Sequence, residues 1–244
     1  MSALDPERAE SAADVSALSV ALYGEALGAM RGVLHVVAVV EEDGAHRVLK
    51  IGEHAPKSAW DRFVLGLARA RAEAILVTGA VLRAEPDLVY ELPARGLYAY
   101  REKIAGLPEP PILLVLTGGD VALEHPALCG WARPVLFTTR AAAARLAGAG
   151  VEVASAEAPS ARAAIAYLRS ERGCRSVSVE AGPRAAGPLY DPPPVIDELM
   201  RSVYEGPLDP RARGAFLPEP SHLVTRSRAR PDAQHPWRFE RWTR

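Results

Sequence analysis

The sequence predicts an α/β fold in which helices flank a mostly parallel central sheet and an antiparallel C-terminal hairpin forms one edge. The first observation is that short apolar runs rich in Val, Ile and Leu alternate with helix-forming segments through the middle of the chain. The second is the different pattern after Ser221, where polar and apolar residues alternate on either side of Pro231-Asp232. Alternation with a period of two is typical of paired strands, and parallel sheets with an antiparallel edge are common.

The expected elements follow one another in a regular order from residue 32 onward. Most of the strands are continuous apolar runs, as expected for strands that are buried on both faces. Ser58 and Thr139 precede two of the helices, and their hydroxyl groups are suited to cap the free N–H groups there. The predicted strands are residues 32–40, 47–51, 74–78, 111–117, 134–138, 151–154 and 176–180, and the predicted helices are residues 58–71, 80–84, 94–106, 141–150 and 160–172. A further element begins at residues 195–199, residues 201–205 are extended, and the hairpin strands are residues 222–229 and 236–244.

Composition restricts the classes of protein to which the chain can belong. With 49% hydrophobic and 24% charged residues, the 244 residues can build an ordinary globular core. The formal net charge of −1 gives no general attraction to nucleic acid or to an anionic membrane. No apolar run approaches the roughly 20 residues of a membrane-spanning helix. The two cysteines, Cys129 and Cys174, form no paired motif, which favours a reducing, cytoplasmic location.

Residues 1–31 differ in character from the rest of the chain. They are rich in Ala, Ser, Glu and Asp, carry acids early and lack the basic and apolar regions of a secretion signal. We therefore expect an N-terminal arm or helix there. Residues 32–244 are expected to form a single domain, because no linker long enough to separate two domains follows.

Four predicted strands end in small or hydroxyl-bearing residues. The ends are Thr78-Gly79, Thr117-Gly118-Gly119, Thr138-Thr139 and Glu180-Ala181-Gly182-Pro183. Ligands of open α/β sheets bind outside the carboxyl ends of the strands, and glycine lets a phosphate or a ring approach the backbone. The residues alone leave two interpretations open, a shared ligand site or four ordinary turns.

Several of these segments, in this order, resemble the C-terminal reductase domain of the bacterial bifunctional deaminase–reductases of the riboflavin pathway. The fold of that domain is similar to dihydrofolate reductase, and the resemblance runs from about residue 32 to the C-terminus. EAGP after an apolar strand, followed by DEL, is its most specific part. The matching segments are EEDG (41–44), ILVTGAVLRAEPDL (75–88), GVEVASA (150–156), SVSVEAGP (176–183) and IDELMRSVYEGPL (196–208).

The resemblance implies an NADPH-dependent reductase that acts on a small pyrimidine- or pterin-like substrate. In the family, hydride transfer to a ribosylaminouracil phosphate opens the ribose to ribitol, and the proteins are commonly homodimers. The acid matched by Asp43 lies near the reacting substrate, so Asp43 is the candidate catalytic residue. The turns matched by residues 79–81 and 180–183 line the cofactor site. With the neighbouring strand ends, the candidate cofactor-binding residues are Thr78, Gly79, Val81, Thr117, Gly118, Glu180, Ala181, Gly182 and Pro183.

The chain departs from the family pattern at positions that bear on activity. Ala181 stands where the family has the first glycine of Gly-Gly-Pro, and Val81 stands where it has threonine. Glu41 and Glu42 replace a serine, which adds negative charge near the expected site of a phosphorylated substrate. These changes are compatible with a reductase of a less anionic substrate, with cofactor binding without fast turnover, or with loss of the cofactor. The alternative function is therefore a non-catalytic dinucleotide-binding or scaffold protein on the same fold.

Other candidate residues have simpler explanations. Asp43-Gly44 is a common turn sequence for backbone reasons alone, and Glu180 is equally suited to accept backbone N–H bonds at the start of a helix. His35, inside an apolar strand, is interpreted as a core histidine. The spacing of the histidines and cysteines predicts no metal site. Arginines interleaved with aromatic residues after Ser221 favour a terminal hairpin over binding of single-stranded nucleic acid.

Overall fold

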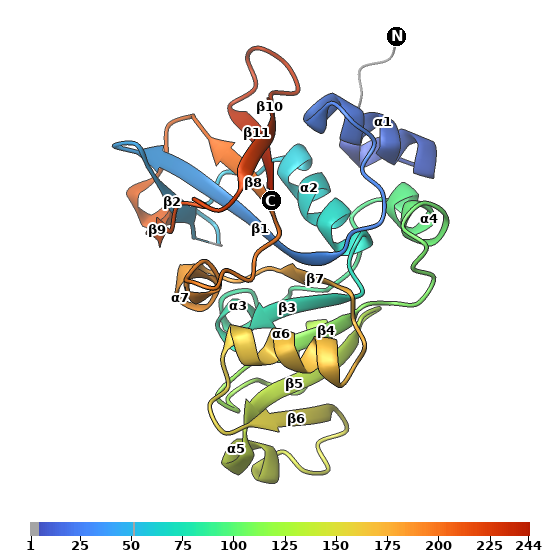
Figure 1. The fold of residues 1–244 in the computed structure, drawn as a ribbon, viewed down its shortest axis with the longest axis vertical. Helices are drawn as coiled ribbons and strands as arrows, with labels where there is room; N and C mark the ends of the chain where they lie inside the picture. The colour runs from blue at the N-terminus through green and yellow to red at the C-terminus, as the bar shows by residue number, and fades with distance from the viewer. Residues whose placement is uncertain (1–4, 51) are drawn as a thin grey trace.

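The computed structural model describes residues 5–50 and 52–244 and contains a single eleven-stranded sheet (Figure 1). The strands are β1 (Gly32–Glu42), β2 (Ala45–Leu49), β3 (Ala74–Thr78), β4 (Ile112–Leu116), β5 (Arg133–Thr139), β6 (Glu152–Ala156), β7 (Ser176–Val179), β8 (Glu198–Tyr204), β9 (Arg213–Leu217), β10 (Val224–Ala229) and β11 (Trp237–Thr243). The α-helices are α1 (Ala12–Tyr23), α2 (Ala59–Ala70), α3 (Gly79–Ala84), α4 (Arg95–Lys103), α5 (Arg140–Arg145), α6 (Ala161–Ser170) and α7 (Pro183–Ala186). No helix in these ranges is long and apolar enough to cross a membrane.

The sheet has the mixed arrangement that the sequence predicts. Its strand order is β10-β11-β8-β1-β7-β3-β4-β5-β6, and the strands from β8 to β6 are parallel. The C-terminal hairpin of β10 and β11 pairs antiparallel with β8 at one edge, as expected. A second antiparallel pair, β2 and β9, extends from the far half of β1.

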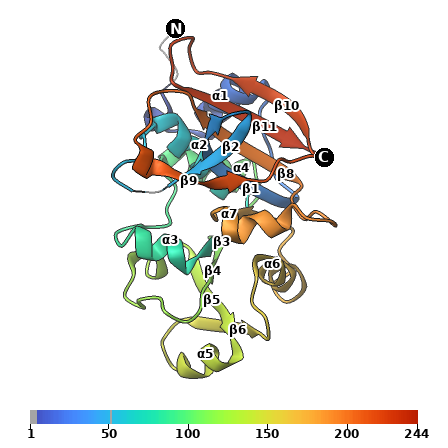
Figure 2. The ribbon, with the colours of Figure 1, turned by 90° about the vertical axis from the view of Figure 1, so that its left-hand side faces the viewer.

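Helices cover both faces of the sheet, which explains why its central parallel strands β3 and β4 are runs of mostly apolar residues. In β1, Val33 and Val37 belong to one core cluster, whereas Leu34 and Val36 belong to another. The helix α6 packs on one face of β3 and β4, and α3 lies on the other (Figure 2). A strand buried on both faces loses the polar–apolar alternation of a half-exposed strand.

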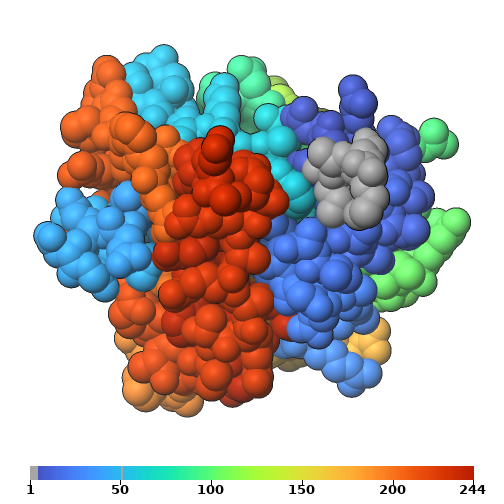
Figure 3. All heavy atoms as spheres, turned by 90° about the horizontal axis from the view of Figure 1, so that it is seen from above, coloured from blue at the N-terminus to red at the C-terminus, as the bar shows by residue number. Residues whose placement is uncertain are grey.

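The N-terminal segment forms a helix that shares the core of the domain. Ser11 and Asp14 form a reciprocal capping box at the start of α1. Leu18 and Leu22 are buried in the same cluster as residues of α2, α4 and β11. Seen from above, the C-terminal hairpin lies beside this segment (Figure 3). The first and last parts of the chain therefore pack against each other.

The structure corrects four expectations about individual elements. Residues 198–204 form one strand, with Glu198 and Arg201 buried in ion pairs that permit charges inside a strand. The strand β2 begins at residue 45, two residues before its expected start, because the turn is only two residues long. The helix α5 ends at residue 145, before two glycines with positive φ. The strand β9 was not expected, because it pairs only with β2 at an edge and contributes little to the core.

Candidate functional site

A cavity of about 1150 Å³ opens at the carboxyl ends of β3, β4 and β7. Three of the four predicted strand ends meet there, whereas Thr138 and Thr139 do not line it. One wall is formed by α2 and the middle of β1, and another by the loop that precedes α6. The cavity-lining residues include all nine sequence-derived candidates, which are Thr78, Gly79, Val81, Thr117, Gly118, Glu180, Ala181, Gly182 and Pro183.

The turn after β3 is packed tightly against the loop after β4. A Cβ atom on Gly79 would lie 3.0 Å from both Thr117 Oγ1 and a methyl group of Val121. The Thr117 hydroxyl donates to Asp120 at 3.1 Å and accepts the N–H of Gly119 at 3.1 Å. The close approach of two loops therefore favours glycine at position 79, and the Thr117 hydroxyl already has its partners.

The turn after β7 presents bare backbone to the cavity. A Cβ atom on Gly182 would have no heavy atom within 4 Å, and one on Gly118 across the cavity would meet only Asp120, at 3.8 Å. Ala181 is 7% exposed and packs in the core, and its carbonyl oxygen lies 3.3 Å from His35 Nε2. The methyl group that replaces the family's glycine therefore occupies little of the cavity surface.

His35 holds this turn from inside the core. It is fully buried, and Tyr190 Oη lies 2.7 Å from its Nδ1. Burial lowers the pKa of His35 to about 4, and the hydrogen bond to the Ala181 carbonyl opposes that shift. A neutral ring with the proton on Nε2 satisfies both contacts, since Nε2–H donates to the carbonyl oxygen and Nδ1 accepts from the tyrosine. The prediction that His35 is a core histidine agrees with this placement.

Glu180 forms a buried ion pair with Arg69 of α2. The guanidinium donates to the two carboxylate oxygens at 2.9 and 2.7 Å, and the two side chains are 7% and 8% exposed. The Arg69 guanidinium also lies over the Tyr90 ring at 4.5 Å and donates to the carbonyl of Glu91 at 3.2 Å. The Glu180 carboxylate is thus held by an arginine, and it does not cap the following helix as one interpretation of the sequence proposed.

Arg69, Tyr90 and Glu85 are cavity residues that sequence reasoning missed. Glu85 is half-buried, and burial raises the pKa of its carboxyl group; Arg69 opposes that shift and Glu180 adds to it. A signal for Arg69 was present in the sequence. Asp61, Leu65 and Arg69 recur every four residues, so they share one stripe of α2, and that stripe faces the cavity.

Asp43 lies apart from this cavity. It forms the two-residue turn between β1 and β2 with Gly44, and the φ angles of the two residues are 52° and 78°. Such turns favour Asp-Gly because both residues adopt the left-handed conformation. Asp43 is exposed and is absent from the cavity lining. The backbone explanation of Asp43-Gly44 therefore accounts for its position without a ligand.

Residues 5–50 and 52–244 contain no group of three or more His, Cys, Asp or Glu side chains placed to hold a metal ion. In this region Cys174 is buried and Cys129 is exposed, and the two form no disulfide. Burial raises the pKa of the Cys174 thiol. The polar groups that line the cavity are carboxylates, arginines, one lysine, backbone groups and the hydroxyls of Thr78, Thr117, Ser160 and Tyr90.

No family model matches the sequence, and no curated protein matches it. Among solved structures, a pyrimidine reductase-like protein from Corynebacterium diphtheriae is similar, with a TM-score of 0.66 and 19% identity over 87% of this chain and 91% of that one. RibD of Acinetobacter baumannii has a TM-score of 0.61 and 18% identity over 88% of this chain, which spans 58% of the RibD chain. The riboflavin biosynthesis reductase Rib7 of Saccharomyces cerevisiae has a TM-score of 0.54 and 13% identity over 93% and 96% of the two chains. The chain therefore has the reductase-domain fold that the resemblance implied.

Proposed function

We propose that this chain is an NADPH-dependent reductase of a small pyrimidine- or pterin-like substrate, of the kind that acts on 5-amino-6-ribosylaminouracil phosphate. The observation that carries the proposal is the convergence of three strand-end turns, two of them with bare glycine backbone, on one large cavity. Its volume exceeds the roughly 300–1000 Å³ of ordinary small-molecule pockets, as a dinucleotide together with a second ligand requires. The fold is shared with a pyrimidine reductase-like protein and with a riboflavin biosynthesis reductase, which supports the same function.

The glycine turns are suited to bind the phosphates of a dinucleotide. The backbone at Gly118 and Gly182 has no side chain to keep a phosphate at a distance. Arg184 is exposed next to the second turn and has no ion-pair partner within residues 5–50 and 52–244, so it supplies positive charge there. When bound, NADPH supplies the hydride, and the protein positions both reactants and excludes water.

Glu85 is the candidate proton donor. Opening a ribose by reduction adds a hydride to the sugar carbon and a proton to the ring oxygen that is released. A carboxyl group whose pKa is raised by burial keeps its proton to higher pH than an exposed glutamate does, so it is suited to donate that proton. Arg69 holds Glu180 in a neutral pair beside it, which limits the negative charge that a phosphorylated substrate meets. Asp43, the candidate catalytic residue from the sequence, is not among the residues that line the cavity, so this proposal assigns the proton to Glu85.

The first test is a fluorescence titration of the purified chain with NADPH and, separately, with NADH. We expect NADPH to bind with a micromolar dissociation constant and NADH more weakly. Absence of NADPH binding up to millimolar concentration contradicts the proposal. Binding without turnover of 5-amino-6-ribosylaminouracil phosphate or a related pyrimidine supports the alternative, a non-catalytic dinucleotide-binding protein on the same fold.

A homodimer in the cytoplasm belongs to the same proposal. Analytical ultracentrifugation of the 26.1 kDa chain distinguishes a dimer from a monomer. A sedimentation coefficient that stays at the monomer value at high protein concentration contradicts the dimer, and it leaves the cofactor proposal intact. The two parts of the proposal are therefore tested separately.

A further inference from the structure

A second, smaller cavity lies at the end of the sheet opposite the candidate cofactor site. This amino-end cavity has a volume of about 250 Å³, and its lining includes Ile112 and Arg133, the first residues of β4 and β5. Cys174 and Arg175, which directly precede β7, also line it. Because these strands run parallel, their amino ends lie a strand length away from the glycine turns at their carboxyl ends. The two cavities are accordingly lined by different residues.

Positive charge dominates the lining of the amino-end cavity, which contains four arginines and two glutamates. Glu73 is occupied by Arg175, at 3.2 Å. Glu109 contributes its backbone carbonyl to Arg101, and its side chain is exposed. Arg101 and Arg133 form no ion pair within residues 5–50 and 52–244. Two positive charges therefore meet at this cavity without a matching carboxylate.

Arg101 is a buried arginine whose contacts are all to neutral groups. It is 3% exposed, and its guanidinium donates to carbonyls at and just after the end of α2, at 3.1 and 2.6 Å, and twice to the Glu109 carbonyl. These bonds use four of its five N–H hydrogens and leave one free. The three other buried arginines in the described part of the chain each bind a glutamate, and they are Arg69, Arg71 and Arg201.

The environment of Arg101 opposes its positive charge. Burial and then the neighbouring charge of Arg133 lower the pKa of the Arg101 guanidinium to about 10, and Glu73 opposes the shift. Backbone carbonyls satisfy hydrogen bonds, but they do not supply the counter-charge that a buried cation lacks. An anion beside both arginines would supply that charge and reduce their mutual repulsion.

Arg133 is placed to bind such an anion. Its side chain is exposed, and its Nε donates to the Pro110 carbonyl at 3.1 Å, which fixes the guanidinium beside the cavity. Its two terminal nitrogens donate no hydrogen bond to the residues that the structure describes. The paired N–H groups of a guanidinium match the oxygens of a phosphate group. The cavity is smaller than the roughly 300–1000 Å³ of common small-molecule sites, so it suits a small anion.

We propose that the amino-end cavity is a second ligand site, in which Arg133 and the remaining N–H of Arg101 bind the phosphate group of a small molecule. The phosphate is the counter-charge that these two arginines lack. It comes either from inorganic phosphate or from a small phosphate monoester, since both present the same oxygens to the arginines. The site is independent of the proposed reductase activity, because it lies at the other end of the strands.

The test is isothermal titration of the full chain with inorganic phosphate and with glycerol 3-phosphate, at an ionic strength held constant with sodium chloride. We expect wild type to bind at least one probe with a submillimolar dissociation constant. Tighter binding of glycerol 3-phosphate assigns the site to a monoester, and tighter binding of inorganic phosphate assigns it to the free anion. Arg133→Gln is expected to weaken the binding by about tenfold or more, because charge-assisted hydrogen bonds are lost.

Two further variants make the result specific to this cavity. Arg95→Gln removes an exposed arginine outside both cavities and is expected to bind the probes as wild type does. Gly182→Val alters the candidate cofactor site and is expected to keep its phosphate affinity. Arg133 is exposed, so the circular dichroism spectrum of Arg133→Gln should match that of wild type.

Three outcomes overturn the inference: no binding of either probe to wild type below millimolar concentration, equal affinity of wild type and Arg133→Gln, or loss of binding in Gly182→Val alone. The last result would place the phosphate at the candidate cofactor site. A separate NADPH titration of the same proteins tests the proposed function. If NADPH does not bind but phosphate binding depends on Arg133, the proposed function fails and the second site stands.

Discussion

At the scale of single residues, a substitution at Gly182 tests the proposed cofactor site most directly. Its backbone has φ −66° and ψ 171°, which any residue adopts, so a side chain there costs no backbone strain. Because the added atoms meet open space, they enter the cavity instead of the core. The surrounding protein therefore gives no packing reason for glycine at position 182, whereas at position 79 two loops approach the glycine closely.

Gly182→Val is therefore expected to weaken NADPH binding by about tenfold or more while changing the free energy of unfolding by less than about 0.5 kcal/mol. Fluorescence titration and urea unfolding measure the two quantities. Gly28→Val is the control, because a Cβ there also meets nothing within 4 Å and Gly28 is absent from the cavity lining. Equal NADPH affinity of the two variants would remove the main support for the cofactor site.

His35 predicts a specific dependence of stability on pH. Its pKa is about 4 in the folded chain and about 6.5 when unfolded, so the unfolded state binds the proton first as the pH falls. This residue alone should lower the free energy of unfolding by about 3 kcal/mol between pH 6.5 and pH 4. His35→Gln keeps a donor and an acceptor but does not titrate, so its profile should be flatter in this window. Parallel profiles of wild type and variant contradict the assignment.

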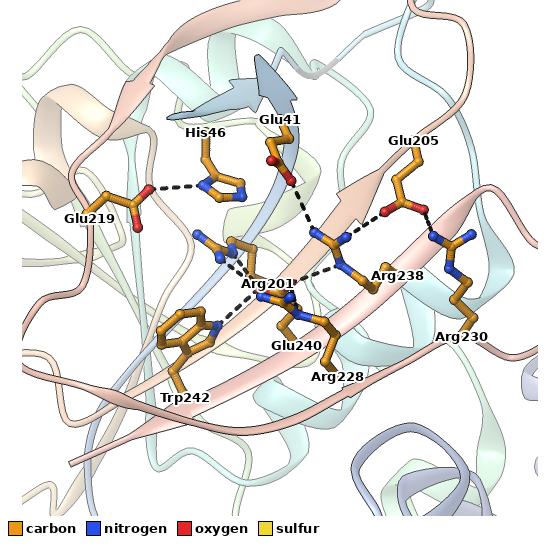
Figure 4. A network of polar contacts seen from close by, with 10 residues as sticks. All are labelled: Glu41, His46, Arg201, Glu205, Glu219, Arg228, Arg230, Arg238, Glu240 and Trp242. Atoms are coloured by element: carbon orange, nitrogen blue, oxygen red, sulfur yellow. Dashed lines mark hydrogen bonds and ion pairs between the residues drawn. The ribbon is translucent and has the colours of Figure 1, made fainter. Parts of the chain in front are cut away.

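At the scale of elements, the C-terminal hairpin shows how the arginine-rich end of the chain is used. Glu240 of β11 is fully buried and accepts hydrogen bonds from Arg201 at 2.9 and 2.7 Å and from the Trp242 indole at 3.1 Å. Arg228 and Arg238 approach the same carboxylate from the hairpin, so one acid joins β8, β10 and β11 (Figure 4). Arg238 is 15% exposed and binds the buried Glu240, and Arg241 is 14% exposed and binds Glu198 of β8. The arginines of β11 therefore bind acids within the fold.

Glu240→Gln is expected to destabilise the protein by about 3–5 kcal/mol, because Arg201 is left buried without its carboxylate. Urea unfolding followed by circular dichroism measures the loss. Glu157→Gln replaces an exposed acid in the loop before α6 and should change stability by less than about 0.5 kcal/mol. A small effect at Glu240 would mean that the network contributes little to holding the hairpin on β8.

At the scale of the whole molecule, the parts predicted correctly are those with a local signature. Residues 74–78 were expected to form a strand and do so with the same bounds, because burial on both faces produces an unbroken apolar run. The cavity-lining turns followed from the same reasoning, since parallel strands place their carboxyl ends at one edge. The remaining features depend on pairs of residues distant in sequence. Arg69 and Glu180 are 111 residues apart, and nothing in the sequence at either position indicates that the two form an ion pair.

The relation of the N-terminal segment to the domain is the last expectation that remains open. A single domain over residues 32–244 would fold without the preceding arm, yet Leu18 and Leu22 of α1 lie in the same core cluster as α4 and β11. We expect a chain shortened to residues 32–244 to lose its cooperative unfolding transition and to bind a hydrophobic dye.

Leu22→Ala in the full chain should cost about 2–5 kcal/mol, because Leu22 is fully buried. Val20→Ala alters a residue of the same helix that is 46% exposed and should have little effect. If the shortened chain unfolds cooperatively at the wild-type midpoint, α1 is an accessory to the fold. If it does not, the cavity wall formed by α2 depends on α1, which lies before the residues that resemble the reductase domain. The folding unit is then larger than the segment that carries the resemblance.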